Sequence, residues 1–149
     1  QIAYIASDAY KFHQTITKEI AKVAFLSFST NGSAEHFRVT RIKEAAKIFS
    51  KKNPCIMASN DIQFDAAISV DISNKKDTNS LIKGKANVFI FPNLDAGNIG
   101  YKIAQQLGGY SAWGPLLQGI NKPVHDLSRG CNVDDIINVA LIAAIQKPT

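Results

Sequence analysis

Apolar residues in the first third of the chain recur with two different periods. Spacings of three and four predict one helix that runs through Ile16 and a second that runs through Phe49. Between them, residues 23–29 read VAFLSFS, a short run rich in β-branched and aromatic side chains that is typical of a strand. The helical positions are Ile2, Ile5, Ala6, Ala9 and Ile16, then Val39, Ile42, Ala46 and Phe49. The predicted order is therefore helix, strand, helix.

Two further apolar runs predict strands in the middle of the chain. Residues 55–59 read CIMAS and residues 86–92 read ANVFIFP, and both are short and apolar as buried strands are. The polar stretch SNKKDTNS at 73–80 lies between them and is read as a separator. The chain thus continues the alternation of strands with other elements.

The remaining apolar positions predict two helices. Residues 98–109 favour a helix that Asn98 caps and that the glycine pair at 108–109 ends. Residues 133–146 favour a last helix, apolar on nearly every side, which we expect to be buried. Alternating strands and helices are typical of an α/β fold, so the sequence predicts a three-layer αβα architecture around a mostly parallel sheet, with function at the loops beyond the strand ends.

Length and composition narrow the class of protein. The chain has 149 residues and is 46% hydrophobic, enough for one domain with a proper core. Its apolar runs are shorter than the ~18 residues that a membrane span needs, and its start lacks the order of a secretory signal, so we expect a soluble protein with no membrane partner. Only Cys55 and Cys131 are present, which favours a reducing compartment and a cytoplasmic location. The first residue is Gln rather than Met, which suggests a processed product, an engineered piece or a fragment of a longer protein.

The net charge of +5 points to an anionic ligand of some kind. The basic residues are scattered in short clusters without interleaved aromatic residues, which argues against nucleic acid as a partner. The three histidines have no metal-binding spacing, and no metal is expected. A small molecule that carries phosphate fits the charge best.

The stretch PVHDLSRGCNVDD at 123–135 concentrates the candidate chemistry. Asn132 is placed to cap the last helix, so that Asp134 and Asp135 lie in its first turn, where acids are stabilised by the helix dipole by ~0.3–1 kcal/mol each. The same geometry also suits a phosphate, because Ser128 offers a hydroxyl and Arg129 a planar fork of donors beside a helix amino terminus. Both interpretations remain open from the residues alone.

Three longer stretches carry a family resemblance. They read IQFDAAIS at 62–69, VFIFPNLDAGNIGYKIAQQLGG at 88–109, and GPLLQGINKPVHDLSRGCNVDDIINVALIAAIQ at 114–146. They closely resemble the carboxyl-terminal half of the phosphate acetyltransferases (phosphotransacetylases) in the phosphate acetyl/butyryltransferase family, and the resemblance runs along essentially all of the chain. It implies reversible transfer of an acetyl group between acetyl phosphate and coenzyme A, giving acetyl-CoA and phosphate.

The resemblance also implies the site. Ser128, Arg129 and Asp135 match the family's catalytic residues, and Ser128 and Arg129 also bind substrate. Coenzyme A is then a substrate, and the reaction needs no cofactor, metal or covalent acetyl-enzyme, so Cys131 is expected to be a bystander. We expect Arg129 to bind the negative charge on the phosphoryl and carbonyl oxygens, and Ser128 to donate a hydrogen bond to the same oxygens. Asp135 is expected to accept the proton of the thiol. An ordinary aspartate with a pKa near 3.9 is a weak base for a thiol near 8.5, so the assignment of Asp135 is the most demanding one.

In the family, two α/β domains flank the cleft. By resemblance, residues 1–114 form the smaller domain, and residues 115–149 return to the larger catalytic domain, whose amino-terminal part is absent here. The chain alone is then expected to be weakly active or inactive and to form a homodimer. Two alternatives stay open: a phosphate butyryltransferase, and a non-catalytic acetyl-CoA-sensing domain like that of bacterial malic enzymes.

A final stretch, STNGS at 29–33, lies between a strand and a helix. Its glycine and backbone N–H groups could cradle a phosphate, or it could be an ordinary polar loop. The sequence favours the ordinary loop without excluding the cradle.

Overall fold

The chain folds into helices and strands in the order that its apolar spacing predicts, with two short helices added. The computed structural model describes residues 1–146. Its elements are α1 (Ile2–Thr17), β1 (Lys22–Leu26), α2 (Phe37–Lys52), β2 (Met57–Ile62), α3 (Phe64–Ile68), α4 (Val70–Lys76), β3 (Val88–Ile90), α5 (Leu94–Gly108) and α6 (Val133–Ile145).

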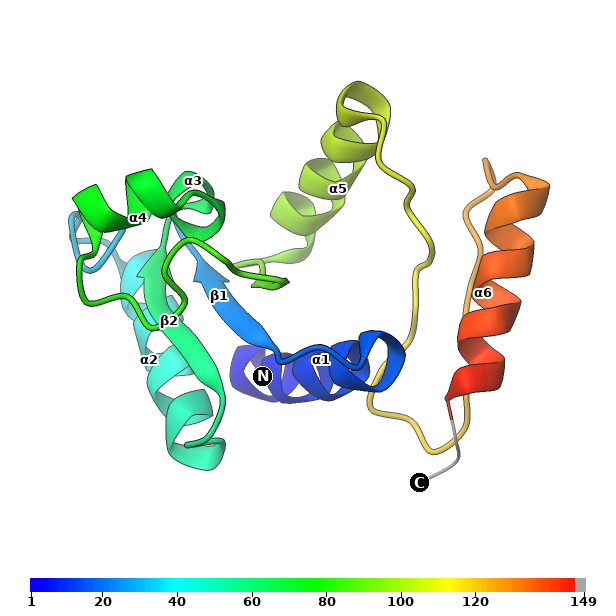
Figure 1. Ribbon diagram of the computed structural model, residues 1–149, viewed down its shortest axis with the longest axis horizontal. Coiled ribbons are helices and arrows are strands. Elements are labelled where there is room, and N and C mark those ends of the chain that lie inside the picture. The colour runs from blue at the N-terminus through cyan, green and yellow to red at the C-terminus, as the bar shows by residue number, and fades with distance from the viewer. Residues whose placement is uncertain (147–149) are drawn as a thin grey trace.

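The three strands form a parallel sheet in the order β2-β1-β3 (Figure 1). Val23 of β1 lies opposite Ala58 of β2 and Val88 of β3, so β1 is the central strand. Because all three strands run the same way, their carboxyl ends meet at one edge of the sheet. In α/β folds this edge is where ligands usually bind.

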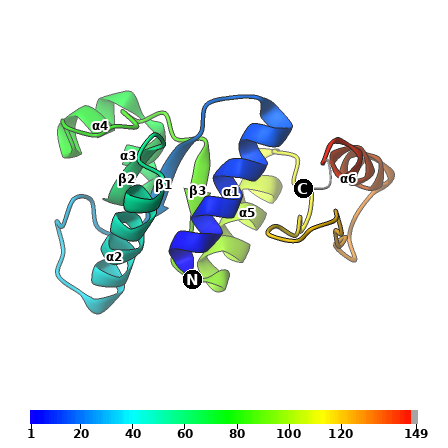
Figure 2. The ribbon, with the colours of Figure 1, turned by 90° about the horizontal axis from the view of Figure 1, so that it is seen from below.

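Successive residues of β1 point to opposite faces of the sheet and define the two outer layers. Val23 and Phe25 pack in a buried cluster with residues of α1 and α2. Ala24 and Leu26 pack on the other face with residues of α3, and Ile72 of α4 adds to that cluster. Figure 2 looks onto the layer formed by α1 and α2. The predicted α/β class, with helices on both faces of a parallel sheet, is confirmed.

Four predicted elements have bounds that are wrong by a few residues. The strands expected at 23–29 and 86–92 are found at Lys22–Leu26 and Val88–Ile90. The strand expected at 55–59 runs instead from Met57 to Ile62, because a turn closed by the Ile56 N–H and the Asn53 carbonyl occupies its first positions. The helix expected from residue 98 begins at Leu94, because Asn93 rather than Asn98 caps it, accepting the Ala96 N–H at 2.8 Å. The error in β2 is therefore caused by a main-chain turn, and the error in α5 by two asparagines that could each cap the helix.

The glycine pair does end this helix, as predicted. Gly109 follows α5 with a φ of +69°, in the left-handed region that glycine adopts without strain. Another glycine, Gly100 within α5, lets the helix approach the Phe91 ring after β3 closely, since a Cβ at this position would lie 3.0 Å from that ring. Phe91 therefore packs against the first turns of α5 and fixes its direction.

The polar stretch at 73–80 was read as a separator, yet its first residues belong to α4. Ser69 caps this helix by accepting the Ile72 N–H at 3.3 Å. The helices α3 and α4 have five and seven residues, too few for a helical period to stand out in the sequence. The capping residue Ser69 is the feature of the sequence that indicates α4.

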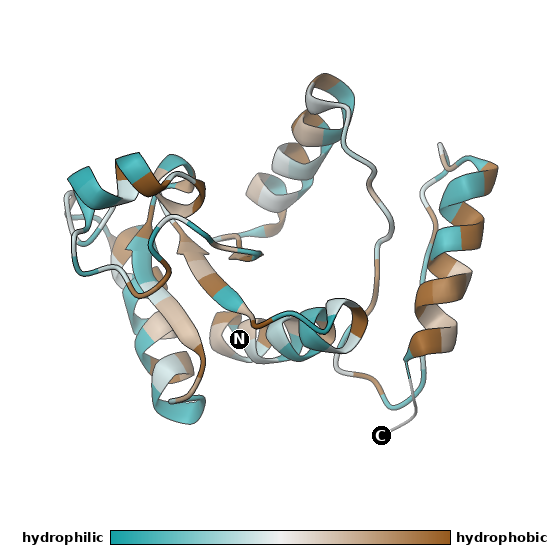
Figure 3. Ribbon diagram, in the orientation of Figure 1, coloured by the Kyte–Doolittle hydropathy of each residue, from teal (hydrophilic) through white to brown (hydrophobic). Residues whose placement is uncertain are grey.

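The last helix forms as predicted, but its predicted burial is wrong. In α6 only Val139 and Ile142 are buried, while Val133 is 70% exposed and Leu141 56% exposed. The helix lies against α1 and away from the sheet (Figure 1), and Figure 3 shows hydrophobic residues recurring along its ribbon. Composition predicted how apolar the helix is, but burial also requires a neighbour, and the described residues supply one only along part of its length.

Candidate active site at the start of helix α6

Ser128 and Arg129 lie on a tight turn that leads into α6. The turn is closed by the Cys131 N–H, which donates to the Ser128 carbonyl at 3.0 Å. The Gly130 N–H donates to Ser128 Oγ at 3.3 Å, so the serine oxygen is already an acceptor and its O–H is left to donate elsewhere. Ser128, Arg129 and Gly130 are all exposed. The turn therefore presents a hydroxyl and a guanidinium to the surroundings.

The start of α6 is fixed by a reciprocal cap. Asn132 Oδ1 accepts the Asp135 N–H at 2.9 Å, and Asp135 Oδ2 accepts the Asn132 N–H at 3.0 Å. This is the cap that the sequence predicts for Asn132, extended by the Asp135 side chain. It fixes Asp135 one helical turn from the Ser128–Arg129 turn. One carboxylate oxygen, Oδ1, is left without a hydrogen bond among the described residues.

The structure brings the three predicted site residues to one end of one helix but does not join them directly. Among residues 1–146, Arg129 forms neither a hydrogen bond nor an ion pair, and Asp135 bonds only within the cap. An Arg that is not bonded to the nearby carboxylate keeps all its donors for another anion. The guanidinium of Arg129 is therefore available to an anion from outside the described residues.

The segment that carries the turn is tied to the far end of α6. His125 Nε2 lies 2.6 Å from Gln146 Oε1, and the Asp126 N–H donates to the Pro115 carbonyl at 3.3 Å. Leu116 and His125 form an isolated antiparallel bridge. The imidazole of His125 thus has a structural partner in Gln146, which leaves Cys131 without a histidine bonded to it in the described part of the chain.

The loop at 29–33 is closed to a phosphate, because its backbone N–H groups are already used. The Thr30 N–H donates to Ser33 Oγ, the Asn31 N–H to the Asp61 carbonyl, and the Gly32 N–H to Asp61 Oδ2 at 3.0 Å. A cradle needs free N–H groups. The loop is therefore an ordinary polar connection, with a carboxylate of the chain itself in the place that an anion would take.

Asp61 is the residue that sequence reasoning missed. It is only 2% exposed, and its Oδ2 accepts the Ser29 hydroxyl at 2.6 Å as well as the Gly32 N–H. The other oxygen, Oδ1, lies 4.0 Å from the Lys43 ammonium. The signal was present in the sequence: a carboxylate directly before the last residue of a buried strand needs donors from the neighbouring loop.

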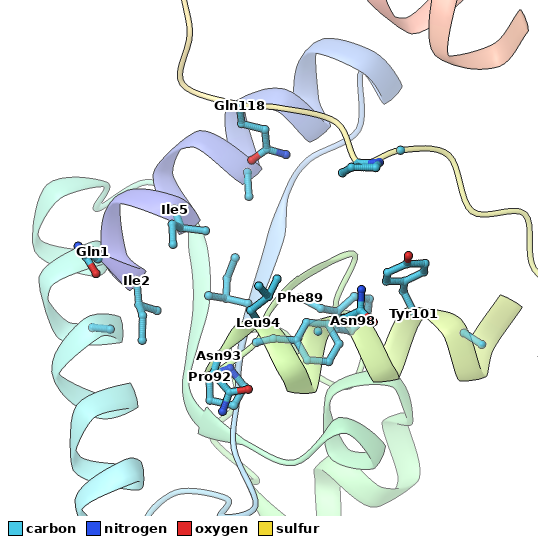
Figure 4. Close-up of a pocket in the computed structure, with 18 of the residues that line it drawn as sticks. Gln1, Ile2, Ile5, Phe89, Pro92, Asn93, Leu94, Asn98, Tyr101 and Gln118 are labelled. Carbon is cyan, nitrogen blue, oxygen red and sulfur yellow. The ribbon is translucent and has the colours of Figure 1, made fainter. Parts of the chain in front are cut away.

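A groove of about 1250 Å³ lies elsewhere, between α1, α2, β3, α5 and residues 110–118 (Figure 4). Its lining is mostly apolar, with Arg41 and Glu44 as its charged side chains, and it includes none of Ser128, Arg129 and Asp135. Among residues 1–146 there is no cluster of His, Cys, Asp or Glu that could hold a metal ion. Arg41 already donates to the Pro92 carbonyl at 3.0 Å, and the groove contains none of the predicted site residues, so the turn before α6 is the better candidate for the chemistry. None of the described helices is both long and apolar enough to cross a membrane.

Comparison with known proteins gives a consistent picture. Residues 1–144 match the family model described as "Phosphate acetyl/butaryl transferase". The phosphate acetyltransferase of Bacillus subtilis is 54% identical over 125 residues, which are 84% of this chain and 39% of that protein. The structure of the phosphotransacetylase EutD from Staphylococcus aureus matches with a TM-score of 0.91 and 47% identity, over 97% of this chain and 44% of its own.

A phosphotransacetylase structure from Streptococcus pyogenes also matches with a TM-score of 0.91, at 44% identity, over 97% of this chain and 44% of its own. This chain therefore spans less than half the length of the relatives it matches. The similarity covers the candidate site, because the family match extends through the turn at Ser128–Arg129 and most of α6. The chain belongs to the phosphate acetyl/butyryltransferase family.

Proposed function

We propose that this chain supplies part of the active site of a phosphate acetyltransferase, which transfers an acetyl group reversibly between acetyl phosphate and coenzyme A. The observation that carries the proposal is the exposed Ser128–Arg129 turn beside the amino terminus of α6, where a hydroxyl and a guanidinium are free to bind an anion. The relatives named phosphate acetyltransferase at about half identity support the choice of reaction.

The proposed chemistry follows from the groups on the turn. The coenzyme A thiol gives its proton to the Asp135 carboxylate, and the thiolate attacks the carbonyl carbon of acetyl phosphate. The bond from that carbon to the bridging oxygen then breaks, and inorganic phosphate leaves with the electron pair. Arg129 binds the phosphate oxygens with its fork of donors, and the Ser128 hydroxyl donates to the oxygen on which charge develops.

Asp135 has the more difficult role, because a carboxylate is a weak base for a thiol. Its Oδ2 is engaged with the Asn132 N–H, so Oδ1 is the oxygen available for the thiol proton. Arg129 and the helix amino terminus favour the thiolate and lower the pKa of the coenzyme A thiol. This reduces the pKa difference between the thiol and the carboxylate. Direct transfer of this kind uses no acetyl-enzyme, so Cys131 takes no part in it.

The proposed site is completed by residues other than those described here. The exposed turn and the exposed apolar residues of α6 support this, as does the length of the relatives, of which this chain matches 39–45%. We assign residues 1–114 to the smaller domain and 115–149 to the larger one. A homodimer, coenzyme A and acetyl phosphate as partners, and a cytoplasmic location belong to the same proposal.

The direct test of the proposed site is Arg129→Lys in a complete enzyme. Lysine keeps the charge but loses the bidentate fork, so the turnover number should fall by about 100-fold or more. Arg38→Lys is the matched control, since Arg38 is also an exposed arginine near a helix amino terminus and should leave turnover unchanged. Initial rates in both directions would measure the effect. Near-normal turnover in Arg129→Lys would remove Arg129 from the site.

A further inference from the structure

The outer edge of β3 is unpaired in the described residues and faces the groove. β3 pairs only with β1, and Phe89, Ile90 and Phe91 line the groove. Main-chain groups on a strand point alternately to its two sides. The Asn87 N–H donates to the carbonyl of Lys22 in β1, so it points toward β1. The N–H groups of Val88 and Ile90 must therefore point to the opposite, open edge of β3.

The two residues that carry these amides are almost fully buried. Val88 is only 7% exposed and Ile90 only 4%. A buried backbone N–H or carbonyl without a partner costs about 1–3 kcal/mol, so such groups are almost always paired in folded proteins. The edge of β3 therefore requires a partner that offers main-chain acceptors and donors in a row.

The groove has the lining that a buried strand would need. Ile2 and Ile5 of α1 lie on one side of the β3 edge, and Leu94 and Tyr101 of α5 lie on the other (Figure 4). A strand between these two helices would be covered on both faces, as the apolar strands of parallel sheets are. The volume of about 1250 Å³ exceeds the ~300–1,000 Å³ that is usual for small-molecule pockets.

The connections of the sheet indicate where such a strand comes from. The crossover from β1 through α2 to β2 runs over the same face of the sheet that α1 covers. Crossovers between parallel strands are almost always right-handed, so a crossover through α1 to β1 must move in the same direction as the one through α2. A strand leading into α1 must then lie on the β3 side of β1. Since β3 fills the first position there, the next position is the outer edge of β3.

The start of α1 lies at the right end of the groove for this path. Gln1 lines the groove together with Pro92 and Asn93, which lie two and three residues beyond the carboxyl end of β3 at Ile90. A strand that ends at Gln1 would therefore finish at the carboxyl edge of the sheet and run parallel to β3. We propose that the β3 edge and its groove bind a parallel, mainly apolar β-strand, namely the stretch of phosphate acetyltransferase chain that leads into α1. This inference rests on the proposed function, because it takes the longer relatives as the source of the strand.

Amide hydrogen exchange tests the proposal without any assay of catalysis. In the 149-residue chain, the Val88 and Ile90 amides should exchange fast while the Phe89 amide, which faces β1, exchanges slowly. The chain is then extended by the segment of about ten residues that aligns directly before Gln1 in the Staphylococcus aureus phosphotransacetylase, enough for a usual strand of ~5–6 residues and its connection. Exchange at Val88 and Ile90 should slow by about tenfold or more.

Two variants make the result specific. Ile5→Glu puts a charge into the groove and should restore fast exchange, whereas Ile103→Glu, at an isoleucine of similar exposure outside the groove lining, should not. A proline in the middle of the added segment lacks a backbone N–H donor and should also restore fast exchange at Val88 and Ile90. Unchanged exchange on extension, or equal protection with the proline, would overturn the proposal. The proposal would also be overturned if the Val88 and Ile90 amides of the unextended chain became more protected as the protein concentration rises. That result would mean that a second copy of the chain binds the β3 edge.

The outcome can be separated from that of the transferase proposal. Protection of Val88 and Ile90 in an extended protein that lacks transferase activity would support the strand and contradict the proposed function. Full activity in a protein whose β3 edge stays unprotected would contradict the strand alone.

Discussion

At the scale of single residues, Asp135 caps α6 and, in the proposed site, is also the base. Its Oδ2 completes the cap with Asn132, which by itself explains why an acid stands at the third position of the helix. Its Oδ1 is left for chemistry among the described residues, beside the exposed Ser128–Arg129 turn. In the proposed mechanism, capping and catalysis use different oxygens of the same carboxylate, so a substitution can separate the two roles.

Asp135→Asn makes that separation. The asparagine carbonyl can still accept the Asn132 N–H, so the free energy of unfolding should fall by less than ~1 kcal/mol. The amide cannot take a proton from the thiol, so kcat of the complete enzyme should fall steeply, with little change in the KM for coenzyme A. Asp134→Asn, at the neighbouring acid, is the control. An unchanged kcat would reduce Asp135 to a helix cap.

At the scale of secondary-structure elements, an ion pair joins α3 to α4. Lys76 Nζ lies 2.7 Å from Asp65 Oδ2 and also donates to Gln63 Oε1 at 3.1 Å. The hydrogen bond from Lys76 is the main cause that lowers the pKa of Asp65 below 3.8. The Ala66 N–H, which Asp65 accepts at 2.7 Å, lowers it further. This connection gives the family-like stretch at 62–69 a structural role.

The pKa of Asp65 should respond to the loss of its partner. Because its pKa is lower in the folded chain, the ionised Asp65 stabilises the fold above its ordinary pKa of 3.8, and this contribution disappears as the pH falls through the lower pKa of the folded chain. Lys76→Met should raise the pKa of Asp65 toward 3.8, measured by NMR titration of the carboxyl carbon. Lys75→Met should leave it unchanged. An equal pKa in the parent and Lys76→Met would show that the pair is absent in solution.

Sequence patterns predicted those elements whose cause is local. The period of α2, the cap of α6 by Asn132 and the stop of α5 at Gly109 all depend on neighbours a few residues away, and all three are confirmed. The burial of α6 and the contacts of Asp61 depend on elements far away in the sequence, and periodicity carries no information about them. The three site residues came from the family resemblance, since a Ser-Arg pair before a helix has an equally good structural explanation.

At the scale of the whole molecule, the ligand-binding ends of its elements face one side. The carboxyl ends of β1 and β2 and the amino-terminal end of α6 all lie toward the top of Figure 1. Parallel strands and helices each bind ligands at these ends, so one cleft on that side is the arrangement that fits. In the proposed site, the described residues would form one wall of such a cleft, and residues from the rest of the enzyme would form the second.

The central claim is that this chain supplies the Arg129 half of a phosphate acetyltransferase site. The most direct test follows thioester formation from acetyl phosphate and coenzyme A with the purified 149-residue chain, alone and then mixed with the separately made amino-terminal half of a phosphate acetyltransferase. We expect very low activity from the chain alone, a large increase on mixing, and no increase when the chain carries Arg129→Lys. Full activity from the chain alone, or an increase that survives Arg129→Lys, would contradict the claim.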